Sequence, residues 1–260
     1  RAANINIDSV RSFRTNHFTG NYHANFTGSF QTEFLGNAII NSLILNRIYS
    51  KEGLVDSTIA NVGGSISRFK SNGNVLNSNL GQFTRYTISG NLIGTNIEIE
   101  QNTKYVKVKG NVLDTVIINQ FDFGTLERLS VGGDFRESSV FVLWDPGRDR
   151  TFNTNDDVGL LNGLSSPLTI RIRGNIDEAY IVAGVIKKAN IGGISIENDY
   201  ERDYGVFCTN ADELIMEGKV KVGSMKYKTP IDNFYVKKIP FDEIEDLPSP
   251  LESSDEFTVI

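Results

Sequence analysis

The stretch Tyr86-Thr-Ile-Ser-Gly90-Asn91-Leu-Ile-Gly-Thr95-Asn-Ile97 decides the fold, because the chain repeats its pattern about twenty residues later. The next copy reads Val106-Lys-Val-Lys-Gly110-Asn111-Val-Leu-Asp-Thr115-Val-Ile117. We assign further copies to Gly20-Asn21, Gly36-Asn37, Gly73-Asn74, Gly133-Asp134 and Gly174-Asn175, and a weaker copy to Glu52-Gly53. Self-similarity at such a period is the signature of a solenoid.

Each copy has apolar residues at fixed offsets from its glycine, with polar residues between them. This alternation predicts short, half-buried strands on both sides of the glycine. Gly and Asn both tolerate left-handed backbone angles, so the pair predicts a sharp corner. A small residue five positions after the glycine predicts a second corner, where stacked coils leave no room for bulk. The small residues are Ser78, Thr95, Thr115, Ser138 and Ala179.

These features predict an all-β fold, a single-stranded parallel β-helix with about 17–23 residues per coil. Stacked coils would place like residues over like, with apolar ladders inside and asparagine ladders at the corner. The alternative is an antiparallel sandwich in which Gly-Asn marks hairpin turns. That alternative does not explain the constant offset of the small residue from the glycine.

The repeat divides the chain into three parts. We expect a solenoid over residues 1–205, terminal strands or a cap over 206–240, and an acidic extended tail over 241–260. Prolines discourage helix in the tail, and its last four residues read as a short strand. The tail is either disordered or adds a strand to the sheet edge of a neighbouring subunit.

Composition excludes several classes of protein. No apolar run is long enough for a membrane span, and the single cysteine, Cys208, excludes an internal disulfide and a thiolate metal cluster. A net charge of −6 without a basic-aromatic cluster argues against nucleic-acid binding. The sequence shows no initiator methionine or signal segment, so we expect a processed chain or part of a longer one.

Charge is unevenly distributed along the sequence. Residues 1–120 hold 11 Lys and Arg against 7 Asp and Glu, a net charge of +4, whereas residues 121–260 hold 15 against 25, a net charge of −10. In an elongated protein this pattern predicts a rod with opposite charge at its two ends, and hence head-to-tail contact. Ordinary solvated surface charge is the alternative.

An acidic insertion over residues 144–160 interrupts the repeat, and the distance from Gly133 to Gly174 equals about two coils. Clustered carboxylate and amide oxygens on a loop bent by Pro and Gly form the donor set that calcium prefers. The sequence therefore predicts a Ca²⁺ site, although the loop does not follow the EF-hand pattern. A solvated acidic loop is the alternative. The candidate ligands are Asp145, Asp149, Asn153, Asn155, Asp156 and Asp157.

The run from Phe141 to Asp157, followed by Ile170 to Gly184, resembles repeats of large secreted bacterial surface proteins. Those repeats pair a Gly-Asn-punctuated β-helix coil with an Asp-rich loop that ends in Thr-x-Asp-Asp. The resemblance covers roughly residues 70–200, and this chain has Arg150 and Asn153 where the family usually has glycine. It implies a β-helical fold and an extracellular or cell-surface location.

We therefore expect a structural protein rather than an enzyme: a secreted subunit of a surface layer (S-layer) or extracellular filament. Its main partner would be itself, through head-to-tail contacts or strand exchange by the tail, and a surface glycan is a further candidate. The alternative is a carbohydrate-active β-helix enzyme or glycan-binding module. For the enzyme, Asp156, Asp157, Arg171 and Arg173 echo a polysaccharide hydrolase, but His17 and His23 lie far away in sequence.

Overall fold

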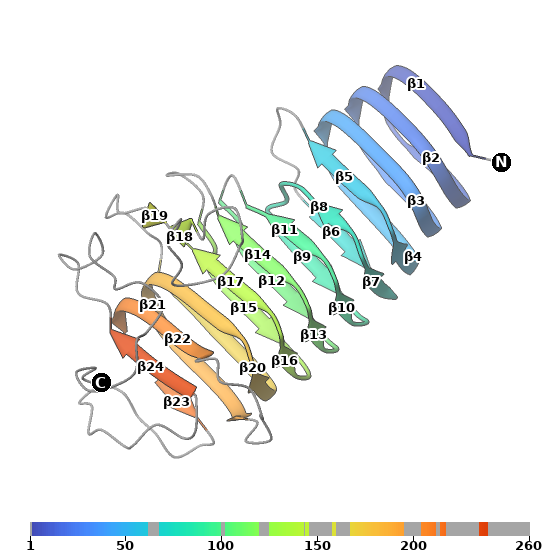
Figure 1. Cartoon of the computed structure of the whole chain (residues 1–260). Coiled ribbons are helices and arrows are strands. Elements are labelled where there is room, and N and C mark those ends of the chain that lie inside the picture. The colour runs from blue at the N-terminus through green and yellow to red at the C-terminus, as the bar shows by residue number, and fades with distance from the viewer. Residues whose placement is uncertain are drawn as a thin grey trace.

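The computed structural model describes residues 2–61, 68–99, 102–119, 125–142, 144–145, 158–159, 167–194, 204–211, 214–216 and 234–238. The chain winds into a parallel β-solenoid of about eight turns (Figure 1). All pairings in the main sheet of this described part are parallel, so the predicted fold class is confirmed and the antiparallel sandwich is wrong. In mid-rod, Val75 pairs with Leu92, Leu92 with Val112, and Val112 with Phe135, which gives offsets of 17, 20 and 23 residues.

Long strands form the N-terminal coils, and short strands form the middle ones. The N-terminal strands are β1 (Ala3–Val10), β2 (Phe13–Thr27), β3 (Phe30–Leu45), β4 (Arg47–Val55) and β5 (Thr58–Asn61). The middle strands are β6 (Arg68–Ser71), β7 (Asn74–Leu76), β8 (Asn79–Leu80), β9 (Arg85–Ile88), β10 (Leu92–Ile93), β11 (Asn96–Glu98), β12 (Tyr105–Val108), β13 (Val112–Leu113), β14 (Val116–Asn119), β15 (Arg128–Val131), β16 (Phe135–Arg136) and β17 (Ser139–Val142).

The last described strands include a small separate pair and further coils. They are β18 (Trp144–Asp145), β19 (Val158–Gly159), β20 (Leu168–Asp177), β21 (Tyr180–Ile194), β22 (Tyr204–Ala211), β23 (Leu214–Met216) and β24 (Phe234–Lys238). Strands β22 and β23 both pair in parallel with β21, and β24 pairs in parallel with β22. Parallel pairing therefore continues past residue 205, where we expected the solenoid to give way to terminal strands.

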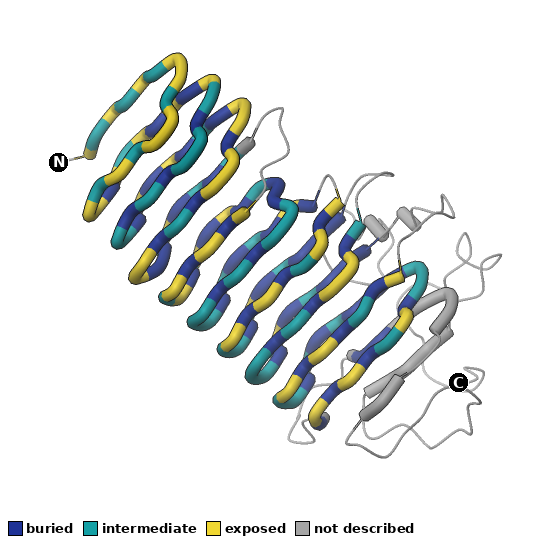
Figure 2. Tube along the Cα trace, turned by 180° about the vertical axis from the view of Figure 1, so that it is seen from behind, coloured by how far each residue is buried: buried dark blue, intermediate teal, exposed yellow. Residues whose placement is uncertain are grey.

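Each middle coil contributes one strand to each of three faces. The first face consists of β6, β9, β12 and β15, extended by the starts of β4 and β20 and the end of β21. The second face consists of β7, β10, β13 and β16, and the third of β8, β11, β14 and β17. Buried residues alternate with more exposed ones along most strands (Figure 2), so the first and second faces have one side in the core and one in solvent. The third face differs, because β14 and β17 each contain three consecutive buried residues.

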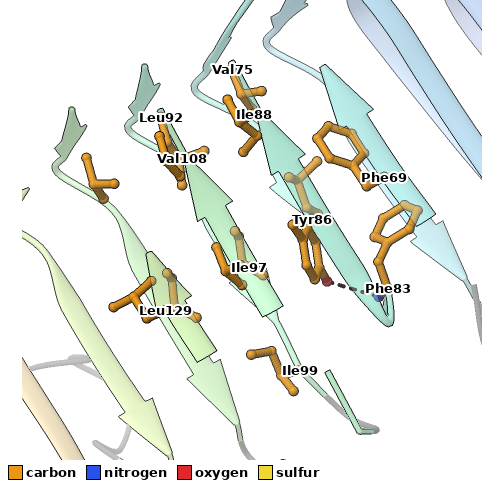
Figure 3. Packing of buried hydrophobic residues seen from close by; sticks show 14 of the residues in the cluster. Phe69, Val75, Phe83, Tyr86, Ile88, Leu92, Ile97, Ile99, Val108 and Leu129 are labelled. Carbon is orange, nitrogen blue, oxygen red and sulfur yellow. Dashed lines mark hydrogen bonds between the residues drawn. The ribbon is translucent and has the colours of Figure 1, made fainter. Parts of the chain in front are cut away.

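The core is built from the apolar columns that the repeat predicts (Figure 3). Val75, Leu92, Val112 and Phe135 stack along the second face and are fully buried. The hydroxyl of the buried Tyr86 is hydrogen-bonded within the core, since it accepts a bond from the Phe83 backbone N–H at 3.0 Å. Burial raises the pKa of Tyr22, and the hydrogen bond with Thr27 partly offsets that effect.

The predicted asparagine ladder is present at the Gly-Asn corner. Each side-chain oxygen accepts a hydrogen bond from the backbone N–H of the equivalent residue in the next coil. The four bonds are Asn91 N to Asn74 Oδ1 (2.8 Å), Asn111 N to Asn91 Oδ1 (2.9 Å), Asp134 N to Asn111 Oδ1 (2.9 Å) and Asn175 N to Asp134 Oδ1 (2.9 Å). We call this series the Asn column.

The reason for the glycine in each pair differs from the one that the sequence suggested. At the stacked pairs from Gly73-Asn74 to Gly174-Asn175 the left-handed backbone angle occurs four residues after the glycine, for example at Asp114 (φ 44°) and Glu137 (φ 46°), whereas in the early pairs Gly20 (φ 107°) and Asn37 (φ 47°) themselves have positive φ. The glycine is needed because the asparagine amide of the preceding coil occupies the space of a side chain. A Cβ at Gly133 would lie 1.9 Å from Asn111 Oδ1.

The predicted second corner is confirmed by a buried column of hydroxyl groups. The Thr115 hydroxyl donates to the Leu113 carbonyl at 2.9 Å, and the Thr115 N–H donates to Ser138 Oγ at 3.1 Å. Equivalent bonds between coils join Ala38 to Ser57, Ser57 to Ser78, Ser78 to Thr95, and Thr95 to Thr115. A small side chain is required because these residues lie inside the rod, where all of them are buried.

Strand register corrects three details of the repeat. Gly36 pairs with Val55, which pairs with Leu76, so Gly36 lies three positions beyond the corner that Gly73 occupies. Gly20 pairs with Ala38, which follows Gly36 on β3 and so also lies beyond the Gly-Asn corner. Neither early Gly-Asn pair therefore belongs to the Asn column. The segment from Gly133 to Gly174 forms one coil rather than two, because Phe135 pairs directly with Ile176. The weaker copy at Glu52-Gly53 is in register, since Gly53 pairs with Asn74.

Candidate functional site

The acidic insertion leaves the solenoid and returns to it at one point. Strands β18 and β19 form an antiparallel pair in which Trp144 faces Gly159 and Asp145 faces Val158. The pair forms a neck, and the twelve residues from 146 to 157 connect its two strands. The pairing of β18 with β19 holds the two ends of this loop close together.

Of the six predicted calcium ligands, only Asp145 lies among the described residues, and it is described by its backbone alone. Asp149, Asn153, Asn155, Asp156 and Asp157 lie outside the described residues, so their convergence on a cation stays a prediction. Elsewhere in the described chain, no group of three or more His, Cys, Asp or Glu side chains could hold a metal. The calcium prediction therefore rests on the loop residues alone.

An apolar column on the outer side of the third face marks where the insertion meets the rod. Ile118, Phe141 and Val182 stack in register, and they are only 1%, 0% and 2% exposed although their neighbours Ile117 and Val140 fill the core. Glu98, which pairs with Ile118 from the preceding coil, is exposed. The column lies on strands that contact β18, since β18 packs against β14 and β21.

Burial of these outward-facing side chains is favourable, since a fully buried Ile, Phe or Val contributes roughly 1.5–3 kcal/mol relative to an exposed one. The contacts of β18 with β14 and β21 place the base of the insertion against strands that carry this column. Sequence reasoning missed the column, although the signal is visible: the apolar pairs Ile117-Ile118, Val140-Phe141 and Ile181-Val182 break the alternation expected of a strand with one solvated side.

The histidines and arginines that hinted at an enzyme lie on strands away from the neck, whereas Asp156 and Asp157 lie outside the described residues. His17 and His23 lie exposed on β2, near the N-terminal end of the rod, and the His17 ring is 6.1 Å from the Phe34 ring. Arg171 and Arg173 lie exposed on β20 in the first face, whereas the neck contacts strands of the third face. These four side chains are therefore not gathered beside the neck.

Charge is segregated by face. The first-face segments 47–51, 68–72, 84–89, 104–109, 127–132, 168–173 and 187–192 contain 13 Lys and Arg and a single acid, Glu127. That is half of the 26 Lys and Arg in the whole chain. The remaining parts of these coils, 52–61, 73–83, 90–99, 110–119, 133–142 and 174–186, contain eight acids and a single cation, Arg136.

This arrangement differs from the rod with oppositely charged ends that the sequence predicted. In the described solenoid the charge separation runs across the rod, because basic residues recur on the outer side of one strand in successive coils. The single cation of the acidic faces is paired: Arg136 lies 3.3 Å from Asp134 and 3.7 Å from Asp177. A count along the sequence could not show this, since it averages the three faces of each coil.

No protein-family model, curated protein or solved structure matches this chain. No helix in the described residues is long and apolar enough to cross a membrane.

Proposed function

We propose that this chain is a secreted, calcium-binding structural subunit of a cell-surface layer or an extracellular filament. The observation that carries the proposal is a regular rod whose first described strand has one free edge. Strand β1 pairs with β2 on one side, and among the described residues it has no partner on the other. Open solenoid ends need a cap or another chain, because unpaired strand edges template further pairing.

The apolar side chains at that end support the same function. Ala3, Ile5, Ile7, Val10 and Phe13 pack against the core but stay only partly buried. Equivalent residues in the middle coils are fully buried, since a further coil covers them on each side. A strand added to β1 would cover these side chains and satisfy the backbone groups of its free edge.

In this proposal, calcium orders the acidic insertion. The anchored base of the loop places Asp145 at the neck, and Asp157 directly precedes the paired residue Val158. A cation coordinated by residues from both ends of the loop would link the two ends. The insertion would then present a fixed surface on the third face for contacts within a layer or filament.

We expect calcium to raise the melting temperature of the purified chain and EDTA to lower it again. Ligand at a hundred times its dissociation constant stabilises a protein by about 2.7 kcal/mol, which for this size is a shift of roughly 5–10 °C. Calorimetry measures both the heat of calcium binding and the melting curve. The variant Asp149→Ala/Asn153→Ala/Asp157→Ala should lose the binding heat, whereas Asp114→Asn, an acid outside the loop, should keep it. No calcium heat and an unchanged melting curve in EDTA would sink the calcium part of the proposal.

A further inference from the structure

A column of cations runs along the outer side of the first face. The paired outward residues are, in order, Lys70, Thr87, Lys107, Ser130, Arg171 and Asn190. Cations and short polar residues thus alternate from coil to coil. The three cations are exposed, and we call this series the cation column.

Two coils that have Thr or Ser in the cation column carry a cation two residues earlier on the same strand. Arg85 is two residues before Thr87, and Arg128 two residues before Ser130, so both point to the same side of their strands. Neighbouring strands are ~4.8 Å apart, so positive charges recur at about that spacing along the axis, and the cations of the cation column at roughly 10 Å. The result is a band of positive charge along the rod axis, two columns wide.

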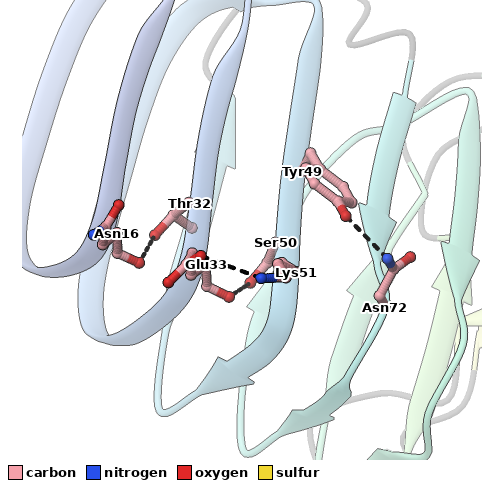
Figure 4. A network of polar contacts seen from close by, with 7 residues as sticks. All are labelled: Asn16, Thr32, Glu33, Tyr49, Ser50, Lys51 and Asn72. Atoms are coloured by element: carbon pink, nitrogen blue, oxygen red, sulfur yellow. Dashed lines mark hydrogen bonds and ion pairs between the residues drawn. The ribbon is translucent and has the colours of Figure 1, made fainter.

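Little on the described protein neutralises this band. Among the described residues, Lys70, Lys107 and Arg171 make no ion pair, whereas Lys51, at the edge of the face, lies 3.2 Å from Glu33 (Figure 4). Lys70 Nζ lies 5.3 Å from the centre of the Tyr49 ring, an interaction that leaves its charge in place. Many like charges on one face repel one another, and an anionic partner would remove that repulsion.

We propose that the first face binds a linear anionic polysaccharide, laid along the rod axis with its acidic groups on the cation column. A straight row of charges matches an extended polymer whose acidic groups recur at regular intervals. The polar residues between the cations, Thr87, Ser130 and Asn190, supply hydrogen-bonding groups for sugar hydroxyls. This partner goes beyond the proposed structural role and requires neither calcium nor assembly.

The same face is poorly suited to nucleic acid. Single-stranded nucleic acids stack their bases on exposed aromatic rings. The outward aromatic residues of the first-face segments are Tyr49 and Tyr105. Tyr49 already has Lys70 over its ring, and its hydroxyl accepts a hydrogen bond from Asn72 Nδ2 at 2.9 Å (Figure 4). A duplex, whose phosphates wind around its axis, would meet a straight row over a short length only.

The test measures binding of the full-length chain to polygalacturonate, a linear polyuronate, in calcium-free buffer by calorimetry. We expect binding that weakens as salt is added, because exposed charges are screened. The variant Lys70→Gln/Lys107→Gln/Arg171→Gln should lose roughly tenfold in affinity, since each exposed pair contributes modestly. The matched variant Lys70→Arg/Lys107→Arg/Arg171→Lys keeps the charges and should bind within about twofold of the parent chain.

Three outcomes would overturn the proposal. The first is equal binding of the methyl-esterified, neutral polymer, which would exclude charge recognition. The second is tighter binding of duplex DNA than of polygalacturonate, which would identify a nucleic-acid surface. The third is binding that appears only after residues 241–260 are deleted, which would identify the acidic tail of the chain as the occupant of the face. Because no calcium is present, each of these results is separate from the test of the calcium site.

Discussion

The substitution Gly133→Ala is expected to destabilise the solenoid by about 2–4 kcal/mol, as overpacking of 1–3 kcal/mol combines with the loss of a hydrogen bond. The new Cβ would lie 1.9 Å from Asn111 Oδ1 and 3.2 Å from the Gly110 carbonyl carbon. The Asn111 amide would have to leave its site, and the 2.9 Å hydrogen bond from the Asp134 N–H would be lost. Thermal unfolding followed by circular dichroism measures the change.

A double-mutant cycle distinguishes this cause from backbone strain. If the Asn111 side chain is what excludes a methyl group at Gly133, then Asn111→Ala should relieve the clash, and the double variant should cost much less than the sum of the two single variants. Additive costs would mean that Gly133 is needed for its backbone conformation instead. The substitution Lys107→Ala, at an exposed position of the first face outside the Asn column, should shift stability by no more than about 0.5 kcal/mol.

Deletion of residues 241–260 is expected to abolish assembly while leaving a folded chain. The tail carries seven acids and neither Lys nor Arg, and it ends in the apolar run Phe257-Thr258-Val259-Ile260. A strand of this kind can add to the free edge of β1 in a neighbouring subunit, where backbone hydrogen bonds and the partly buried Ile5 and Ile7 would hold it. Analytical ultracentrifugation should show polymers for the full chain and monomers for the truncated one.

The control replaces the acids of the tail and keeps its length and terminal strand. The variant Asp242→Asn/Glu243→Gln/Glu245→Gln/Asp246→Asn should still assemble, but more slowly at low salt, because charge steers the encounter and backbone pairing holds the complex. Polymers of the truncated chain that match those of the full chain would contradict the role of the tail. So would a full chain that stays monomeric at every concentration.

The sequence predicted the coil well because its period is imposed by packing. Residues such as Val112 and Phe135 stack in the core, and Thr115 and Ser138 stack at the second corner, so the same residue types recur at constant offsets. The role of Gly133 was misread, because its neighbour Asn111 is 22 positions away in sequence and becomes adjacent only when coils stack. Local conformational preference offered a plausible reason, and contact between coils supplied the actual one.

The early repeats were misplaced for a related reason. Gly20 and Gly36 carry the Gly-Asn signature, but no stacked asparagine column fixes their register, and long strands with a bulge replace the short ones there. Charge segregation was hidden because Lys107 and Asp114 belong to different faces of one coil, although they are only seven residues apart. The apolar column of Ile118 and Phe141 on the outer side of the third face could not be assigned from sequence, because the strand that packs against it, β18, follows in a separate segment of the chain.

Electron microscopy of the purified full chain in negative stain tests whether a calcium-binding solenoid subunit builds an extracellular assembly. Samples at equal protein concentration are prepared in millimolar calcium and in EDTA. We expect ordered filaments or sheets in calcium, with solenoid rods as the repeating unit, and isolated rods in EDTA. Isolated rods in both samples, at concentrations where the chain is folded, would contradict this expectation.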